Sequence, residues 1–174
     1  SCCRGILTCS VRSKWSAKVK NLLPLPTPPE HIHHFTAIRD RKKLVVRNVL
    51  AASHVAIDAR FDAFAARVAA GNIEAVGAST LMAISDQLRL CYDSPTIRLG
   101  ALLAAIKAIQ PAGQLKYCPY CQTTLGKTED HYLPASRFPE FSVHPLNLVP
   151  ACSTCNSTKG DNWLDPAGCR QYLQ

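Results

Sequence analysis

Two closely spaced cysteine pairs are the residues of this sequence best suited to metal chemistry. They are Cys118-x2-Cys121 and Cys152-x2-Cys155, and thirty residues lie between the pairs. Each pair can form a knuckle whose two sulfurs face one ion, and four thiolates in a tetrahedral arrangement favour Zn²⁺. Such a site has no open coordination position, so the spacing predicts a structural zinc. Disulfides or chance spacing are the alternatives.

Four polar residues between and beside the knuckles form a second group. A zinc ion would pin the ends of the insert together, so Asp130, His131, Asn147 and Asn156 can converge although they are distant in sequence. Asp130 supplies a hard oxygen suited to a divalent cation. His131, with an ordinary pKa near 6.5, can take a proton from water at neutral pH. Taken singly, each could instead be a surface histidine or a capping asparagine.

Asp130 and His131 are neighbours in a segment expected to be a strand. Side chains alternate between the two faces of a strand, so both can serve one site only at a bulge or at a strand end. Asn156 falls in the first turn of the helix expected after the second knuckle, where its carbonyl oxygen could complete a cation site with Asp130.

The order and spacing of these residues resemble those of a known nuclease family. The matching residues are Cys118-x2-Cys121, Asp130-His131-x2-Pro134, Asn147-Leu148 and Cys152-x2-Cys155-Asn156-x2-Lys159-Gly160. They resemble the HNH endonucleases of the zinc-stapled ββα-metal type, over about residues 117–161. Asn156 at the third signature position makes the chain similar to the H-N-N variant.

The resemblance implies a role for each residue. Asp130 and Asn156 would hold one catalytic Mg²⁺ or Mn²⁺, and His131 would be the general base that activates water. Asn147 would hydrogen-bond across the loop between the two strands and orient His131. Lys159 would contact a substrate phosphate, although an exposed helix lysine is an equally good interpretation. The implied activity is hydrolysis of phosphodiester bonds in DNA. Arg137 is a weaker phosphate-binding candidate, and His144 is interpreted as a loop residue.

Positive charge is concentrated in the first third of the chain. The formal net charge is +8, and residues 1–60 hold eleven Lys and Arg against three acids, whereas residues 118–174 carry a net −1. The basic segment can neutralise DNA phosphates, or it can simply be solvated. The candidates are Lys14, Lys18, Lys20, Arg39, Arg41, Lys42, Lys43 and Arg47. A partner protein that delivers the nucleic acid is the alternative.

The elements that must position these residues fall into three segments. Residues 1–29 form a basic, proline-rich arm that we expect to be poorly ordered, because Leu25-Pro26-Thr27-Pro28-Pro29 suits neither a helix nor a sheet. Residues 30–116 form a helical accessory region, and residues 117–174 form the nuclease module. The predicted fold class is therefore mainly α with a small α+β tail, a ββα-metal module built on the four-cysteine zinc site.

Apolar periodicity places the individual elements. A long helical stretch is predicted from Phe35 to Gly71, with a break near Asp40 or Ser53 that the periodicity does not locate. Ser94 and Pro95 are predicted to begin a later helix that ends near residue 109. The remaining expected elements are a helix over 78–90, short strands over 128–133 and 146–149, and a helix over 153–163.

Composition excludes several classes of protein. No run of 18 apolar residues occurs, so we expect no membrane span, and the start of the chain lacks the apolar core of a signal peptide. Nine cysteines without such a signal indicate a reducing compartment, the cytoplasm. A non-catalytic zinc module that binds nucleic acid or a protein partner is the alternative function. By analogy of fold, an HNH module with a helical extension suggests a bacterial defence or mobile-element system.

Overall fold

The computed structural model describes residues 22–25, 30–123 and 128–168. These residues are mostly helical and include one small antiparallel sheet, as predicted. The helices are α1 (Glu30–Arg39), α2 (Leu44–Ala52), α3 (His54–Ala69), α4 (Ser85–Asp93), α5 (Ile97–Ala108) and α6 (Ser153–Lys159), and the strands are β1 (Thr128–His131) and β2 (Leu148–Ala151). None of the helices in the described part of the chain has the length and apolar character needed to cross a membrane.

The long helical stretch predicted from Phe35 to Gly71 is divided into three helices. Breaks occur both after Arg39 and at Ser53, so each of the two predicted positions is used. Ser53 has a φ of −96° and a ψ of 6°, and its carbonyl still accepts from the Ile57 N–H, so α2 and α3 meet at a tight corner. Gly71 ends α3 in the left-handed conformation, with a φ of +67°, which a residue without Cβ adopts easily.

Two helix starts differ from the sequence prediction. Helix α4 begins at Ser85, because Met82–Ile84 forms a short 3₁₀ turn before it. Helix α5 begins after Thr96 and not at Ser94 and Pro95. The Thr96 side chain accepts a hydrogen bond from the Leu99 N–H at 3.2 Å, and its extended backbone suits the N-cap position.

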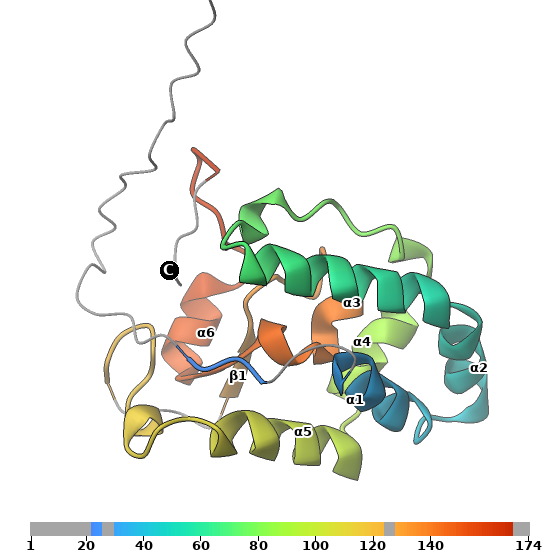
Figure 1. Ribbon diagram of the computed structural model, residues 1–174, viewed down its shortest axis with the longest axis horizontal. Helices are drawn as coiled ribbons and strands as arrows, with labels where there is room; N and C mark the ends of the chain where they lie inside the picture. Colours follow the sequence, from blue (N-terminus) through green and yellow to red (C-terminus); the bar gives the residue numbers. More distant parts are fainter. Residues whose placement is uncertain (1–21, 26–29, 124–127, 169–174) are drawn as a thin grey trace, which may run out of the picture.

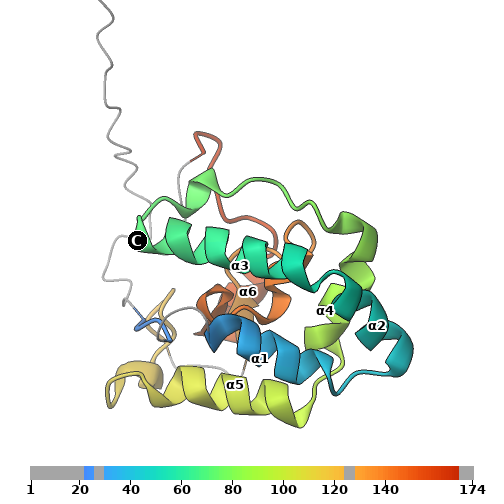
Figure 2. The same ribbon diagram turned by 45° about the vertical axis from the view of Figure 1, so that its right-hand side comes forward.

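The two strands and α6 form a ββα unit. Strand β1 pairs with β2 so that Asp130 lies opposite Val149 and His131 opposite Leu148. Helix α6 follows β2 directly. Figures 1 and 2 show α1, α3, α4 and α5 arranged around the unit. Between the strands, the chain forms two short 3₁₀ helices, Pro139–Val143 and Pro145–Asn147, and the first packs against α3 and α4.

One hydrophobic core runs through both the helical region and the ββα unit. Phe64 of α3 stacks on Phe141 from the loop between the strands, with ring centroids 4.6 Å apart. Next to them, Glu140 is buried and accepts from Arg60 Nε at 2.8 Å. The described residues of the segments 30–116 and 117–174 therefore share one hydrophobic core, although the two sequences differ in composition.

The proline-rich arm predicted over residues 1–29 lies outside the described residues, except for residues 22–25. Within that short piece, the Leu23 N–H donates to Gln110 Oε1 at 2.9 Å and the Leu23 carbonyl accepts from Gln110 Nε2 at 2.9 Å. These two hydrogen bonds join the piece to the segment that follows α5, so at least this part of the predicted arm has a defined place.

Candidate functional site

The four predicted cysteines lie together and could hold a metal ion. Their Sγ atoms all lie within 4.8 Å of one another, and those of Cys121 and Cys152 are 3.8 Å apart. A tetrahedron with metal–sulfur bonds of about 2.3 Å has edges of about 3.8 Å. The donor set and its spacing therefore suit one tetrahedral ion.

The backbone around each knuckle prepares the sulfurs for that role. Gln122 follows the first pair with a φ of +60°, and this turn brings the Thr123 carbonyl to accept from the Cys118 N–H at 2.7 Å. Cys152 is the N-cap of α6, and its Sγ accepts from the Cys155 N–H at 3.4 Å. The Cys118 Sγ accepts from the Cys152 N–H, also at 3.4 Å. Such N–H donors stabilise negative charge on the sulfurs.

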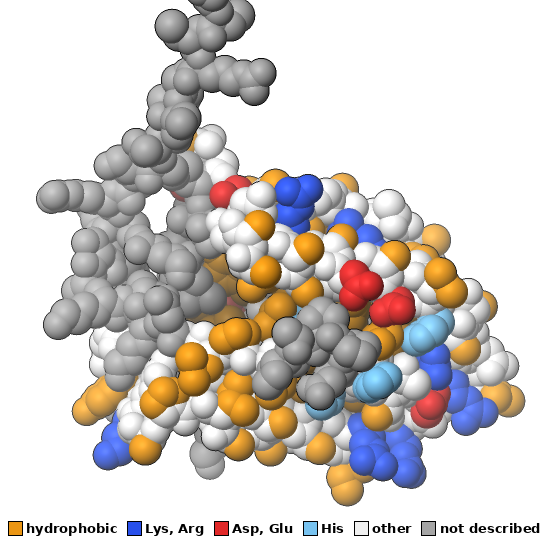
Figure 3. All heavy atoms as spheres, in the orientation of Figure 1, with side chains coloured by type: hydrophobic (Ala, Val, Ile, Leu, Met, Phe, Trp, Pro, Cys, Tyr) orange, Lys and Arg blue, Asp and Glu red, His pale blue; other side chains and the backbone are white. Residues whose placement is uncertain are grey.

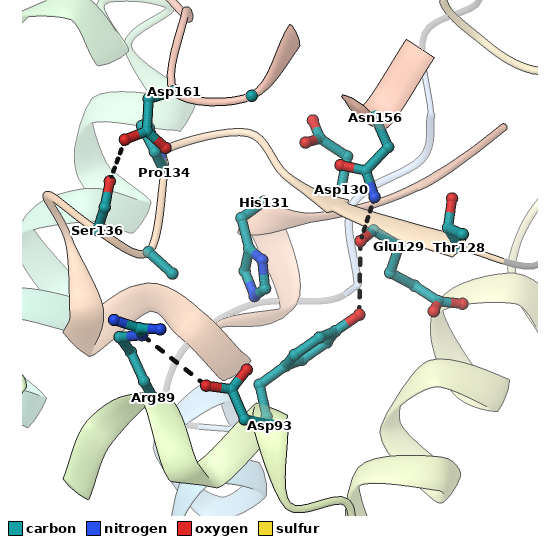
Figure 4. Close-up of a pocket in the computed structure, with 13 residues that line it drawn as sticks. Arg89, Asp93, Thr128, Glu129, Asp130, His131, Pro134, Ser136, Asn156 and Asp161 are labelled. Carbon is teal, nitrogen blue, oxygen red and sulfur yellow. Dashed lines mark hydrogen bonds and ion pairs between the residues drawn. The ribbon is translucent and has the colours of Figure 1, made fainter. Parts of the chain in front are cut away.

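A cleft of about 570 Å³ lies between β1, the start of the loop after it, α6 and α4. Figure 4 shows His131 in the middle of this cleft, with Asp130 and Asn156 on one side. The structure thus brings together three of the four residues predicted to form the site. Asp130 and His131 share the cleft because they are the last two residues of β1, at the strand end that the sequence analysis required.

His131 is held by contacts on two sides of its ring. Its Nε2 lies 2.8 Å from the carbonyl oxygen of Ser142. Because a carbonyl only accepts, Nε2 carries the proton of the neutral ring and Nδ1 carries the lone pair. Tyr92 packs edge-on against the ring, with centroids 4.4 Å apart. Burial lowers the pKa of His131 below its ordinary value, although the Ser142 carbonyl opposes this shift. The ring is therefore neutral at pH 7.

Asp130 is buried and has two side-chain partners. Its Oδ2 accepts from the Tyr120 hydroxyl at 2.7 Å, and its Oδ1 pairs with Lys159 Nζ at 3.1 Å. Each carboxylate oxygen has two lone pairs, so both oxygens can accept a further interaction. Burial and the Asp130 charge raise the pKa of Tyr120 well above its usual range, so this phenol stays a donor.

Asn156 lies on α6 next to Asp130. Its Nδ2 donates to the Glu129 carbonyl at 3.3 Å, and Figure 4 shows its amide beside the Asp130 carboxylate. The contact to Glu129 turns the amide nitrogen away and leaves the oxygen available. Asp130 and Asn156 therefore present neighbouring oxygen donors, the type that a hard divalent cation prefers.

Asn147 lies outside the cleft and is completely buried. Its Oδ1 accepts from the Leu133 N–H at 2.7 Å, and its Nδ2 donates to the carbonyls of Leu133 and Phe141, both at 3.0 Å. One side chain thus ties both ends of the loop between the strands. Ser142, which bonds His131, is the residue after Phe141, so this clamp fixes the carbonyl that orients the histidine.

Neither Lys159 nor Arg137, the two residues of the module that were predicted to bind phosphate, lines the cleft. Lys159 is completely buried, and its Nζ bonds Asp130 and, at 2.8 Å, the His131 carbonyl. Its ammonium group is thus committed to the interior and does not reach a substrate in this structure. Arg137 is exposed but is not among the residues that line the cleft.

The sequence analysis missed two sets of residues. Arg89, Tyr92 and Asp93 of α4 line the cleft, although they lie well before the motif. His144 lies in the loop between the strands, as interpreted, but its complete burial was not foreseen, and its ring lies 4.5 Å from that of Phe61. Burial holds the pKa of His144 well below its usual range. A helix was predicted over 78–90, but nothing in that segment indicated which groove its polar residues face.

The basic residues predicted to bind DNA in the first third of the chain have different environments. Lys14, Lys18 and Lys20 lie outside the described residues. Arg39 pairs with Asp40 at 2.8 Å, and Lys42 bonds carbonyls at the end of α4. The side chains that stay exposed are Arg41, Lys43 and Arg47. Figure 3 shows Lys and Arg side chains gathered near the turn between α1 and α2.

Comparison with known proteins gives one short similarity. The chain is 54% identical over 41 residues to Protein ea31 of Escherichia phage lambda, a match that covers 22% of this chain. The matched segment spans only 14% of the length of the phage protein. No protein-family model matches the chain, and no solved structure matches it.

Proposed function

We propose that this chain is a metal-dependent endonuclease that hydrolyses phosphodiester bonds of DNA. The observation that carries the proposal is the cleft in which a neutral, oriented His131 lies beside Asp130 and Asn156. The resemblance of the motif to HNH endonucleases supports the same assignment. The lambda protein that is similar over part of its length suggests a phage-related setting, and we propose a defence or mobile-element system.

In this proposal His131 is the general base. Its Nε2–H stays bound to Ser142, and its Nδ1 accepts the proton of the water that attacks phosphorus. The lowered pKa of His131 keeps the accepting nitrogen unprotonated at neutral pH. Tyr92 and the Ser142 carbonyl fix the ring, and Asn147 fixes the loop that carries this carbonyl.

Asp130 and Asn156 would hold one Mg²⁺ or Mn²⁺. A divalent cation bound there would offset the charge of the scissile phosphate and stabilise the leaving oxygen. The two residues fit this role because their oxygens are neighbours and because both side chains are oriented by other groups, Lys159 and the Glu129 carbonyl.

The cysteine cluster would hold a structural Zn²⁺. Four thiolates select zinc, and its tetrahedral geometry agrees with the sulfur separation of 3.8 Å between Cys121 and Cys152. The cluster links the start of the ββα unit to the N-terminus of α6, so the ion would fix Asn156 relative to β1. This is how a non-catalytic ion would assemble the catalytic residues.

The test is cleavage of supercoiled plasmid and of single-stranded DNA by the purified protein. We expect nicked or linear products with Mg²⁺ or Mn²⁺ and none with a chelator that removes these ions. Full activity in the chelator would contradict a cation-dependent reaction.

A second candidate function is a zinc module that binds nucleic acid or a protein partner without cutting. The observation that favours it is the pairing of Asp130 with Lys159, since a carboxylate already neutralised by an ammonium does not require a cation. DNA binding without cleavage under every ion would support this candidate.

A further inference from the structure

The candidate cleft is rich in acidic groups, yet its proposed substrate is a polyanion. Asp93, Glu129, Asp130 and Asp161 all line it. Two of these acids have lysine partners: Lys107 pairs with Glu129 at 2.6 Å and Lys159 with Asp130 at 3.1 Å. A phosphodiester that enters the cleft therefore needs positive charge beyond what these pairs provide.

Among the thirteen described residues that line the cleft, Arg89 is the one lysine or arginine. It comes from α4, and Figure 4 shows its guanidinium extending from the helix toward His131. Its side chain is 49% exposed. Its Nε lies 3.8 Å from Asp93 Oδ2, beyond hydrogen-bond length, so the guanidinium keeps its donors for another acceptor.

We propose that Arg89 binds a phosphate oxygen of the nucleic acid in the cleft. The inference rests on the proposed function and deepens it, because it assigns substrate binding to a helix outside the ββα unit. A guanidinium presents two parallel N–H donors that match two oxygens of one phosphate, and its charge does not depend on pH. Lys159, the phosphate-binding candidate from the motif, is buried and paired with Asp130. Arg89 therefore provides the phosphate contact that the motif would assign to Lys159.

The first test measures binding and does not depend on cleavage. In protein that carries His131→Ala, the affinity for a short DNA duplex is measured against salt concentration, with Arg89→Ala or Arg98→Ala added. Arg98 is an exposed arginine of α5 and gives the same change of net charge. We expect Arg89→Ala to weaken binding about tenfold and to reduce the salt slope by about one. Equal effects of the two substitutions would overturn the proposal.

The second test measures single-turnover cleavage of plasmid DNA with His131 intact. We expect Arg89→Ala to slow cleavage by about 10- to 100-fold. Arg89→Lys should slow cleavage less than Arg89→Ala, because lysine keeps the positive charge but lacks the two parallel N–H donors of the guanidinium. An exposed i,i+4 ion pair contributes little to stability, so the variants should fold like the parent protein.

The two tests separate the two hypotheses. If the parent protein cuts and Arg89→Ala cuts equally fast, the assignment of Arg89 is wrong while the nuclease remains. If no form of the protein cuts, the proposed function fails, and the salt slope still decides whether Arg89 binds phosphate.

Discussion

The pair of Asp130 and Lys159 is the most constrained feature at the scale of single residues. Lys159 is completely buried, and its Nζ bonds Asp130 Oδ1 and the carbonyls of His131 and Gly160. Burial lowers the pKa of Lys159, while the Asp130 charge opposes the shift. The lysine therefore acts as an internal brace that holds the end of β1 against the end of α6.

Replacing Lys159 with methionine should destabilise the protein strongly. The change leaves the Asp130 carboxylate buried without its cation, and removal of one partner from a buried ion pair costs about 3–5 kcal/mol. The free energy of unfolding in denaturant measures the loss. Lys116→Met, at an exposed lysine, is the matched control and should be nearly neutral. Similar stability of both variants would show that Lys159 is not a brace.

The sequence predicted the grouping of Asp130, His131 and Asn156 but not the position of Lys159. The grouping followed from local rules, namely a strand end and two cysteine knuckles that fix the ends of the insert. The burial of Lys159 depends on Tyr132, whose ring lies 5.9 Å from its Nζ, and on the turn at Gly160. A lysine in the last turn of a short polar helix has the pattern of a solvated residue, so its sequence context gives no sign of burial.

At the scale of elements, α4 is the part of the helical region that completes the cleft. Its last turn carries Arg89, Tyr92 and Asp93, and Lys42 caps the end of this turn. Lys42 Nζ donates to the Leu90 carbonyl at 2.6 Å and also to the Ser94 carbonyl. The Leu90 carbonyl also accepts from the Ser94 N–H at 3.2 Å, so Lys42 adds a second donor at the C-terminal end of α4, where the helix dipole favours a cation.

Lys42→Ala should destabilise the end of α4 and slow cleavage. Hydrogen bonds from a charged donor contribute on the order of 1–2 kcal/mol when partly exposed, and their loss frees the turn that holds Tyr92 against His131. Thermal unfolding and plasmid cleavage measure the two effects. The neighbouring Lys43 is exposed, so Lys43→Ala should leave stability unchanged and affect only the affinity for DNA. If both variants behave alike, Lys42 is an ordinary phosphate contact.

The sequence predicted which segments form helices and strands more accurately than it predicted where these elements begin and end. Apolar residues at three- and four-residue intervals located the long helical stretch, because burial of one helix face produces this spacing. The strands were located from short extended runs between the cysteine pairs, and neither β1 nor β2 alternates between buried and exposed residues. The start of α5 was misplaced by two residues, because Ser94 and Pro95 have the composition of a helix start while the hydroxyl of Thr96 makes the actual cap. Which side chain bonds a backbone N–H depends on backbone angles that composition does not specify.

At the scale of the whole molecule, the helical region and the ββα unit are bound by one interior. Phe61 and Phe64 of α3 enclose His144 and Phe141 from the loop between the strands. Arg60 and Ser79 both bond the buried Glu140 from outside that loop. Contacts of this kind join residues that are 61 to 80 positions apart in sequence. The change of composition near residue 117 suggested a boundary there, but the hydrophobic core of the described residues continues across it.

Loss of the proposed zinc should therefore destabilise the helices together with the ββα unit. We expect about one zinc per chain in the parent protein and none in Cys152→Ser. The melting temperature, followed by helical circular dichroism, should fall by at least about 10 °C, since a structural zinc contributes several kcal/mol or more. Cys91→Ala, at a buried cysteine outside the cluster, should keep its zinc. An unchanged helical transition in Cys152→Ser would mean that the two parts fold independently.

The measurement that tests the central claim most directly is DNA cleavage by His131→Ala, compared with Asn156→Ala and with His33→Ala at an exposed histidine of α1. Removal of the proton acceptor should lower the cleavage rate by about 10²-fold or more, with zinc content, folding and DNA affinity unchanged. Added Mg²⁺ or Mn²⁺ should partly restore Asn156→Ala, which loses a cation ligand, and should not restore His131→Ala. His33→Ala should cut at the parental rate. A His131→Ala protein that cuts as fast as its parent, in a preparation free of other nucleases, would contradict the account.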